Sequence, residues 1–282
     1  MSIHGVFLID KPAGITSFGV IKKLRGITRI KKMGHAGTLD PMATGLLPIF
    51  VGKATRAVNL FLNDKKEYLV TMKLGIQTDT GDMEGSIISQ TTYEKQLPPV
   101  NEIKKISSQI PPNYSAIKYN GQKAYKLARK RVEFKLPERK IQIHEFQFNE
   151  IAYPLVCYSA VVSKGTYVRA LSQQIAHMIH TCATTTSIRR TKIGETNIEK
   201  AVSLDKLDIN NWKSHLLPLE FFFKKMPRIH LSEKWEKNYK NGMQIKFPKT
   251  KNGFYMVLNQ RESCIGFGKL KDEVLQPKMV MI

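Results

Sequence analysis

One stretch decides the fold of this 282-residue chain: Gly34-His35-Ala36-Gly37-Thr38-Leu39-Asp40-Pro41-Met42-Ala43-Thr44-Gly45-Leu46-Leu47-Pro48. Its three glycines allow backbone conformations and close approaches that other residues resist. An aspartate before a proline is typical of a helix N-cap, so a structural interpretation of Asp40 competes with a catalytic one. His35 lies in the same loop, which therefore holds two reactive side chains in an accessible segment. Asp40 is the first candidate for chemistry.

The regions outside this loop predict an α/β fold. Short apolar or alternating runs predict strands at residues 5–9, 46–51, 67–74 and 151–163. One helix is expected to begin at Thr16 or Ser17, and another is expected to run from Asn101 to Ile110. A third helix follows Tyr167, and its apolar stripe consists of Val168, Leu171, Ile175 and Met178.

A change of pattern divides the chain into two predicted domains. Residues 218–227 are apolar, then basic, and end in a proline, which is typical of a boundary. Residues 228–282 contain short apolar runs between Gly, Asn and Pro turns, which predict a small β-barrel. We expect a catalytic domain over residues 1–227, with an insertion at about 113–140, and a barrel domain over 228–282.

The charge of the chain is strongly positive. There are 45 Lys and Arg residues against 23 Asp and Glu residues, and the formal net charge is +22. A chain this basic is expected to bind a polyanion or an acidic surface, which argues against a small-metabolite enzyme with a neutral surface. No apolar run approaches the ~18 residues that span a bilayer. The residues up to Pro12 contain no signal-like apolar core, so we expect a cytoplasmic protein without membrane attachment.

The insertion at residues 113–140 is the most basic segment that we single out. It holds nine Lys or Arg residues against two Glu residues, a net charge of +7. Aromatic side chains lie between these charges at Tyr114, Tyr119, Tyr125 and Phe134. Basic residues attract phosphates and aromatic rings stack on bases, so the segment is interpreted as a nucleic-acid contact. The alternative is an ordinary solvated helix over residues 122–131.

The cysteines and histidines give little support for a metal site. Three cysteines lie far apart and form neither a disulfide framework nor a C-x-x-C pair. The best metal candidate is the group His177, His180 and Cys182, but no second cluster completes a ligand set. We interpret this group as ordinary helix surface, and we predict neither a metal nor a cofactor.

Arg169 is the second candidate for chemistry. It falls in the first turn of its predicted helix, where the helix dipole disfavours a cation. Its position one residue from the apolar stripe predicts partial burial, and a semi-buried arginine favours a carboxylate partner. Tyr68, on the predicted strand 67–74, is by default a core aromatic residue.

Residues 34–48 resemble the catalytic motif of the pseudouridine synthases. The resemblance is strongest to the TruB-type branch, which acts on uridine 55 in the T loop of tRNA. The family's other motifs follow in the expected order along almost the whole chain, at Asp10–Ser17, Lys66–Tyr68, Pro111–Lys118, Ser163–Arg169 and Ile188–Arg190. The C-terminal residues resemble a PUA-type RNA-binding barrel more weakly.

The resemblance implies a role for each matching residue. Asp40 would be the nucleophile, Arg169 would pair with its carboxylate, and Tyr68 would stack on the target uracil and take part in proton transfer. His35 would help to hold the nucleotide out of its loop. The remaining pocket residues implied are Tyr167, Ile188 and Lys11. The RNA-binding residues implied are Lys118, Lys123, Lys126, Arg129, Lys130, Arg131, Arg189 and Arg190.

The resemblance also implies a fold, a reaction and a partner. The fold would be α/β (α+β), with a mixed, mostly antiparallel central sheet. The reaction breaks an N-glycosidic bond, turns the uracil and rejoins it through carbon, which requires no redox change. A carboxylate can hold one fragment covalently, by attack on the base or on C1′ of the ribose. The partner would be the T arm of tRNA, bound by a monomer without a guide RNA. A synthase for another uridine, a guided synthase and a non-catalytic RNA binder are the alternatives.

Overall fold

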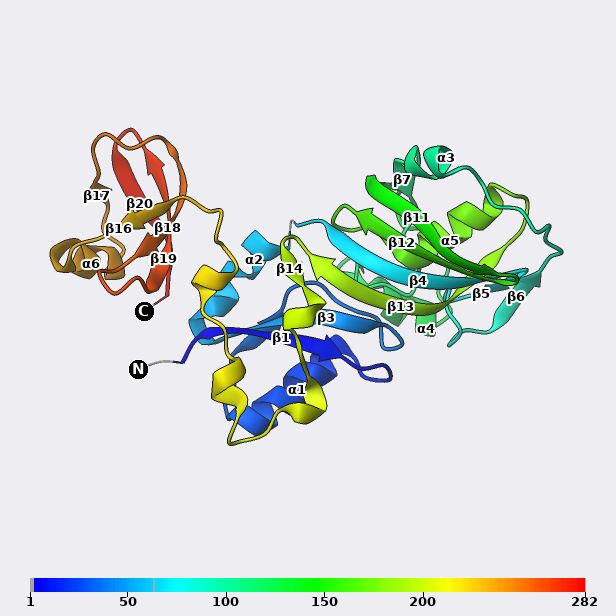
Figure 1. Ribbon diagram of the computed structural model, residues 1–282, viewed down its shortest axis with the longest axis horizontal. Helices are drawn as coiled ribbons and strands as arrows, with labels where there is room; N and C mark the ends of the chain where they lie inside the picture. Colours follow the sequence, from blue (N-terminus) through cyan, green and yellow to red (C-terminus); the bar gives the residue numbers. More distant parts are fainter. Residues whose placement is uncertain (1–2, 63, 282) are drawn as a thin grey trace.

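A nine-stranded mixed sheet carries the candidate site (Figure 1). The computed structural model describes residues 3–62 and 64–281, so Met1, Ser2 and Ile282, the ends of the two predicted domains, lie outside the described residues. The strands are β1 (Gly5–Lys11), β2 (Met33–His35), β3 (Thr44–Val51), β4 (Lys66–Leu74), β11 (Ile143–Ala152), β12 (Leu155–Val162), β13 (Ala183–Ile193), β14 (Thr196–Asn197) and β15 (Val202–Ser203).

The order of strands in this sheet is β11-β12-β4-β13-β3-β1-β15, and β14 and β2 pair with β13 and β3. The β1–β15 and β13–β3 pairs are parallel, whereas the other pairs are antiparallel. The predicted mixed, mostly antiparallel sheet is therefore confirmed.

Helices α1 (Ser17–Thr28) and α5 (Val168–His177) cover one face of the sheet. This face, which we call the front face, carries Tyr68 and the alternate residues of β4, which are buried, while Leu69 is exposed on the opposite face. Thr16 caps α1 as predicted, because its hydroxyl accepts a hydrogen bond from the backbone of Gly19. The other helices are α2 (Val58–Phe61), α3 (Val100–Lys104), α4 (Ala124–Arg129) and α6 (Glu233–Lys240), with short 3-10 segments at 52–57, 198–200, 204–206, 212–215 and 219–221.

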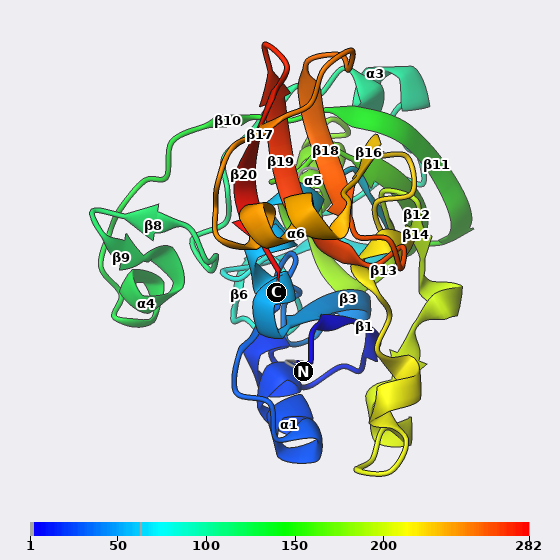
Figure 2. The same cartoon turned by 90° about the vertical axis from the view of Figure 1, so that its left-hand side faces the viewer.

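The insertion projects from the sheet, as Figure 2 shows for β8, β9 and α4. Strands β7 (Ser108–Gln109) and β10 (Arg139–Lys140) pair at its base, and β8 (Lys118–Tyr119) and β9 (Gln122–Lys123) form a hairpin at its tip. A separate hairpin joins β5 (Ile76–Thr78) and β6 (Ile87–Gln90).

The C-terminal residues form a second, curled sheet (Figure 1). Its strands are β16 (Arg228–His230), β17 (Ile245–Lys246), β18 (Gly253–Leu258), β19 (Cys264–Lys271) and β20 (Val274–Val280), in the order β16-β18-β19-β20-β17. Met256 and Phe267 of this sheet share one buried apolar cluster with Val6, Leu8 and Phe50. The two sheets are therefore joined by a continuous hydrophobic core across the back face of β1 and β3, opposite the front face.

Three expectations for the secondary structure were wrong. The helix expected over residues 101–110 ends at Lys104, because residues 108–109 pair with the far end of the insertion. The strand expected over 151–163 is two strands, since residues 153–154 form a turn between β11 and β12. Met178 is not part of the buried apolar stripe of α5, because it is the C-cap residue of the helix and is 37% exposed. No helix among the described residues is both long and apolar enough to cross a membrane.

Candidate active site

A pocket of about 250 Å³ lies at the front face, where the Asp40 loop meets the start of α5. Pockets that enclose a whole small ligand usually measure ~300–1000 Å³, so this one suits a smaller group such as a single base. The site residues that line it are Asp40, Tyr68, Tyr167 and Ile188, together with Lys66, Ser115 and Arg190.

Asp40 and Arg169 form an ion pair at this pocket. Nε of Arg169 lies 2.9 Å from Oδ2 of Asp40. The arginine side chain is 4% exposed, while the aspartate is 33% exposed and so remains open to the pocket. Arg169 also donates to the backbone carbonyls of Thr80 and Tyr114. The guanidinium is therefore held in one orientation, and it fixes the direction of the Asp40 carboxylate.

Asp82 is a second carboxylate beside Arg169, and the sequence reasoning missed it. Its Oδ2 lies 3.5 Å from Nη1 of Arg169, and its side chain is 6% exposed. Oδ1 of Asp82 accepts from the Thr80 hydroxyl and from the Glu84 backbone. The turn that carries Asp82 is far from Arg169 in sequence, so only the fold reveals that the arginine bridges two carboxylates.

Lys11 and Ser17 hold the loop that carries Asp40. Nζ of Lys11 donates to the carbonyls of Pro12, Ile15 and Pro41 at 2.8, 2.7 and 3.0 Å. Burial lowers the pKa of Lys11 to about 8, against the opposing effect of the nearby Asp40 carboxylate. The Ser17 hydroxyl bonds both the N–H and the carbonyl of Leu39 at 2.9 Å. Lys11 therefore acts on the loop from behind, rather than as part of the pocket wall.

Tyr68 and Ile188 come from neighbouring strands. Ile188 of β13 lies opposite Val70 of β4, so it shares the front face with Tyr68. Both side chains are buried, at 8% and 3% exposed. Tyr167 approaches from the residue before α5, and burial raises the pKa of its hydroxyl. The three side chains give the pocket the apolar and aromatic surface that a flat base requires.

His35 lies on β2, beside the loop but not among the residues that line the pocket. Within the described residues its buried Nδ1 has no hydrogen-bond partner. Burial, and then the positive charges of Arg190 and Lys123, lower the pKa of His35. The ring is therefore neutral at neutral pH.

Lys66 also lines the pocket, although the sequence motifs imply no role for it. Its Nζ donates to the carbonyls of Leu62 and Asp64 at 3.2 and 2.7 Å. Burial lowers the pKa of Lys66 to about 8, and the Arg190 charge acts in the same direction. Lys66 directly precedes the predicted strand that carries Tyr68, and this position is the sequence feature that could have indicated a place at the pocket.

The predicted RNA contacts of the insertion are on its surface. Lys118, Lys123, Lys126, Arg129, Lys130 and Arg131 are all exposed. Lys123 and Arg129 lie over the Tyr125 ring, at 5.8 and 5.6 Å from its centroid. A cleft of about 1100 Å³ separates the insertion from the turn at residues 79–86. The insertion thus combines positive charge with aromatic surface beside an open cleft.

The structure places Arg189 and Arg190, two further predicted RNA contacts, in different surroundings. Arg189 alternates with Ile188 and so lies on the back face, where it pairs with Asp10 at 2.7 Å. Arg190 is 1% exposed and donates to the carbonyls of Leu46 and Gly37. The strand alternation of β13 separates the two side chains, and the buried one supports the Asp40 loop from below.

A second basic surface, which the sequence reasoning missed, follows α1. Residues 17–39 contain six Lys or Arg and no Asp or Glu. Five of the six are exposed, and Arg25 lies partly buried over the ring of Phe18. Since α1 covers the same sheet face as α5, this surface lies on the face that holds the pocket. The six residues are Lys22, Lys23, Arg25, Arg29, Lys31 and Lys32.

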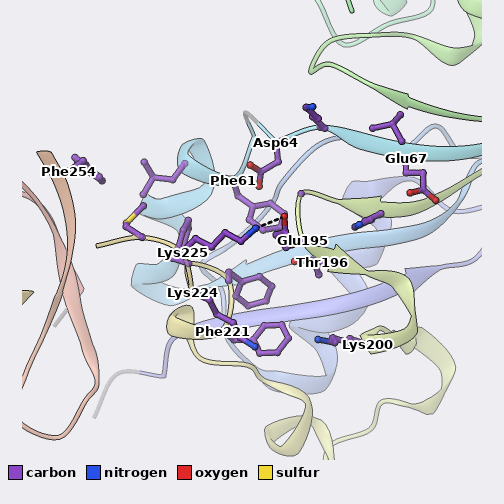
Figure 3. A pocket seen from close by; sticks show the side chains of 18 of the residues that line it. Phe61, Asp64, Glu67, Glu195, Thr196, Lys200, Phe221, Lys224, Lys225 and Phe254 are labelled. Carbon is purple, nitrogen blue, oxygen red and sulfur yellow. Dashed lines mark hydrogen bonds and ion pairs between the residues drawn. The ribbon is translucent and has the colours of Figure 1, made fainter. Parts of the chain in front are cut away.

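A second, larger groove lies between the two sheets. Residues of both sheets line a groove of about 890 Å³, which Figure 3 shows with its Lys225–Glu195 ion pair. Five lysines and four acidic residues line this groove, so it has little net charge to attract a polyanion. Among the described residues, no group of three or more His, Cys, Asp or Glu side chains is arranged to hold a metal.

Known structures share this fold. A chain of the crystal structure of a Cbf5-Nop10-Gar1 complex matches with a TM-score of 0.72 and 22% sequence identity, over 99% of this chain and 85% of that chain. A chain from the structure of an H/ACA RNP bound to a substrate RNA containing 2′-deoxyuridine matches with a TM-score of 0.71 and 22% identity, over 99% of this chain and 85% of that chain. These matches establish the architecture of both sheets.

Sequence comparison identifies the family to which the chain belongs. A relative from Clostridium tetani, a tRNA pseudouridine synthase B, is 38% identical over 96% of this chain and 97% of its own length. A relative of the same name from Hydrogenovibrio crunogenus is 33% identical over 98% of this chain and 93% of its own length. The family model for the "TruB family pseudouridylate synthase (N terminal domain)" matches residues 25–168. The chain therefore belongs to the TruB family of pseudouridylate synthases, which are isomerases that act on RNA.

Proposed function

We propose that this protein converts uridine 55 in the T loop of tRNA to pseudouridine, with Asp40 as the nucleophile. The observation that carries the proposal is the Asp40–Arg169 ion pair at the mouth of a pocket lined by Tyr68, Tyr167 and Ile188. An RNA-binding protein without activity has no use for a part-exposed carboxylate aimed by a buried arginine. The tRNA substrate is the one in the names of the full-length relatives.

The geometry supports base flipping. The pocket holds about 250 Å³, so a base must leave its stack to enter it. Leaving the stack costs a few kcal/mol, which stacking on the Tyr68 and Tyr167 rings would offset. His35, neutral and with a free buried Nδ1, lies beside the same loop and would help to hold the flipped nucleotide out.

The proposal assigns a residue to each step of the reaction. Asp40 attacks and holds one fragment while the bond between N1 and C1′ breaks. The uracil turns, the bond between C5 and C1′ forms, the bond between Asp40 and its fragment breaks, and the hydrogen at C5 leaves as a proton. Tyr68, directly beside the pocket, is the residue proposed to stack on the ring and move that proton. Arg169 keeps the carboxylate charged and directed throughout.

The partner would be the T arm of tRNA. The exposed basic residues of the insertion and the basic surface of α1 would neutralise its phosphates. We further propose that the protein acts as a monomer in the cytoplasm without a guide RNA. The predicted division into a synthase domain over residues 1–227 and an RNA-binding domain over 228–282 belongs to the same proposal.

Tritium release tests the proposal directly. A tRNA transcript labelled at uridine C5 is incubated with the protein alone, and a second transcript carries cytidine in place of the T-loop target. Release from the first transcript and none from the second establishes both chemistry and position. Release from both transcripts would show that the protein modifies a uridine other than the T-loop target. Tight, salt-sensitive binding without release from either favours a guided synthase or a non-catalytic binder.

A further inference from the structure

The strand at the base of the insertion holds an active-site residue through its backbone. Gln109 of β7 is 2% exposed, and its side-chain amide bonds both peptide groups of Tyr167. Oε1 accepts from the Tyr167 N–H at 2.5 Å, and Nε2 donates to the Tyr167 carbonyl at 3.3 Å. The same carbonyl accepts from the N–H of Leu171 in the first turn of α5. Gln109 therefore holds the chain at the point where helix α5 begins.

The segment before Tyr167 is a tight turn, in which the Thr166 N–H donates to the Ser163 carbonyl. Lys164 and Gly165 are exposed, and Gly165 has a φ of +81°, so the loop can take conformations closed to other residues. Tyr167 itself is extended, with φ −98° and ψ 111°, and has no side-chain cap for the helix that it precedes. The two hydrogen bonds from Gln109 thus set the backbone direction from which the Tyr167 ring enters the pocket.

Gln109 also lies where the insertion joins the body of the protein. It pairs with Arg139 of β10, so the two ends of the insertion meet at this residue. A few residues further on, the carbonyl of Tyr114 accepts from Arg169 at 2.9 Å. The chain that enters the insertion therefore contacts Tyr167 through Gln109 and the arginine that directs Asp40 through the Tyr114 carbonyl.

We propose that Gln109 is a positioning residue for the isomerisation: it fixes the backbone of Tyr167, and through it the wall of the base pocket, from the root of the RNA-binding insertion. This inference rests on the proposed function, because it takes Tyr167 as a contact of the target base. We expect Gln109 to affect the rate of the chemical step, because it is buried and cannot touch the RNA.

A matched pair of variants tests this role. Gln109→Met keeps the volume of the side chain and removes both hydrogen bonds to Tyr167. The control is Gln174→Met, because Gln174 donates to Ser108 of the same strand at 2.9 Å without touching a pocket residue. We expect Gln109→Met to lower kcat by about 10- to 100-fold, as small misplacements of reacting groups do. KM for tRNA should stay within about twofold, and Gln174→Met should keep both constants close to those of the wild type.

A second substitution keeps the test decisive if the methionine variant does not fold. Gln109→Glu retains the acceptor for the Tyr167 N–H and loses the donor to its carbonyl, so its kcat should fall between those of the wild type and Gln109→Met. A wild-type kcat in both Gln109 variants overturns the inference, and so does an equal loss in Gln174→Met. A wild-type protein that releases no tritium from the T-loop uridine contradicts the proposed function instead.

Discussion

Nε of Arg169 lies 2.9 Å from Oδ2 of Asp40, and the two residues meet although 128 residues separate them in the chain. The aspartate is part-exposed and the arginine is buried. Asp40→Asn keeps the size and hydrogen bonding of the side chain but removes the charge that attacks. We expect kcat to fall by at least about 1000-fold, as with other nucleophiles, while the Kd for tRNA stays within about twofold. Single-turnover tritium release and filter binding measure the two; substantial residual turnover would contradict the assignment.

The second carboxylate beside Arg169 should matter for rate. Asp82→Asn leaves the guanidinium with Asp40 as its remaining carboxylate partner, so its position becomes less constrained. We expect kcat to fall by about tenfold or more, with KM little changed, because misdirected catalytic groups lose rate steeply. Asp79→Asn is the control, since Asp79 is an exposed residue of the same turn that bonds only within it. Equal effects of the two substitutions would show that the turn, and not the charge, is what matters.

The hydroxyl of Tyr68 can be separated from its ring. Tyr68→Phe keeps the stacking surface, so the Kd for tRNA should stay close to that of the wild type. If the hydroxyl moves the proton from C5, kcat should fall by about 100-fold or more, in the range of general acid–base contributions. Tyr68→Leu removes the ring as well and should weaken RNA binding too. An unchanged kcat in Tyr68→Phe would leave stacking as the residue's role.

The insertion should contribute a measurable number of phosphate contacts. The triple substitution Lys126→Gln, Arg129→Gln and Lys130→Gln removes three exposed charges. Each phosphate contact contributes ~0.9 to the slope of log K against log salt, so the slope should become shallower by up to about 3. Lys225→Gln is the control, because this lysine lies in the nearly neutral groove and pairs with Glu195. An equal change of slope in the triple variant and in Lys225→Gln would show that the insertion is not part of the RNA interface.

Burial of Lys11 should make stability depend on pH. Its pKa is about 8 in the folded protein, below its ordinary value of 10.5. Between these pH values the unfolded chain binds more protons than the folded one, so this residue makes the free energy of unfolding rise with pH. The free energy of unfolding of the wild type minus that of Lys11→Met should therefore increase from pH about 8 to 10.5. Urea unfolding of both proteins at several pH values measures this difference in the free energy of unfolding. A difference that does not change with pH would contradict the burial of Lys11.

The sequence was most informative where local pattern determines geometry. The alternation of β4 placed Tyr68 on a buried face, and the glycine-rich loop placed Asp40 beside it. The position of Arg169 next to the apolar stripe of α5 predicted a part-buried arginine in need of a carboxylate, and two carboxylates lie beside it. In each case the residue's own neighbours carry the signal.

Contacts between distant segments could not be predicted in this way. Asp82 contacts Arg169 from a turn, and Gln109 contacts the Tyr167 backbone from a two-residue strand. Neither residue has a local pattern that distinguishes it from a surface residue. Strand β11 was missed because register shifts interrupt its alternation. The different surroundings of Arg189 and Arg190 could not be predicted either, because positive charge alone does not reveal which face of β13 a side chain occupies.

The apolar cluster that joins the two sheets has a consequence for biogenesis. The back face of β1 and β3 is covered by Met256, Leu258 and Phe267, which a ribosome makes last. The N-terminal strands therefore emerge long before their covering residues and must wait with Val6, Leu8 and Phe50 accessible to water. Nascent chains that expose such surface are prone to aggregate. Native packing of the first strand is thus a late event of synthesis, and a chain halted before residue 256 should depend on chaperones to stay in solution.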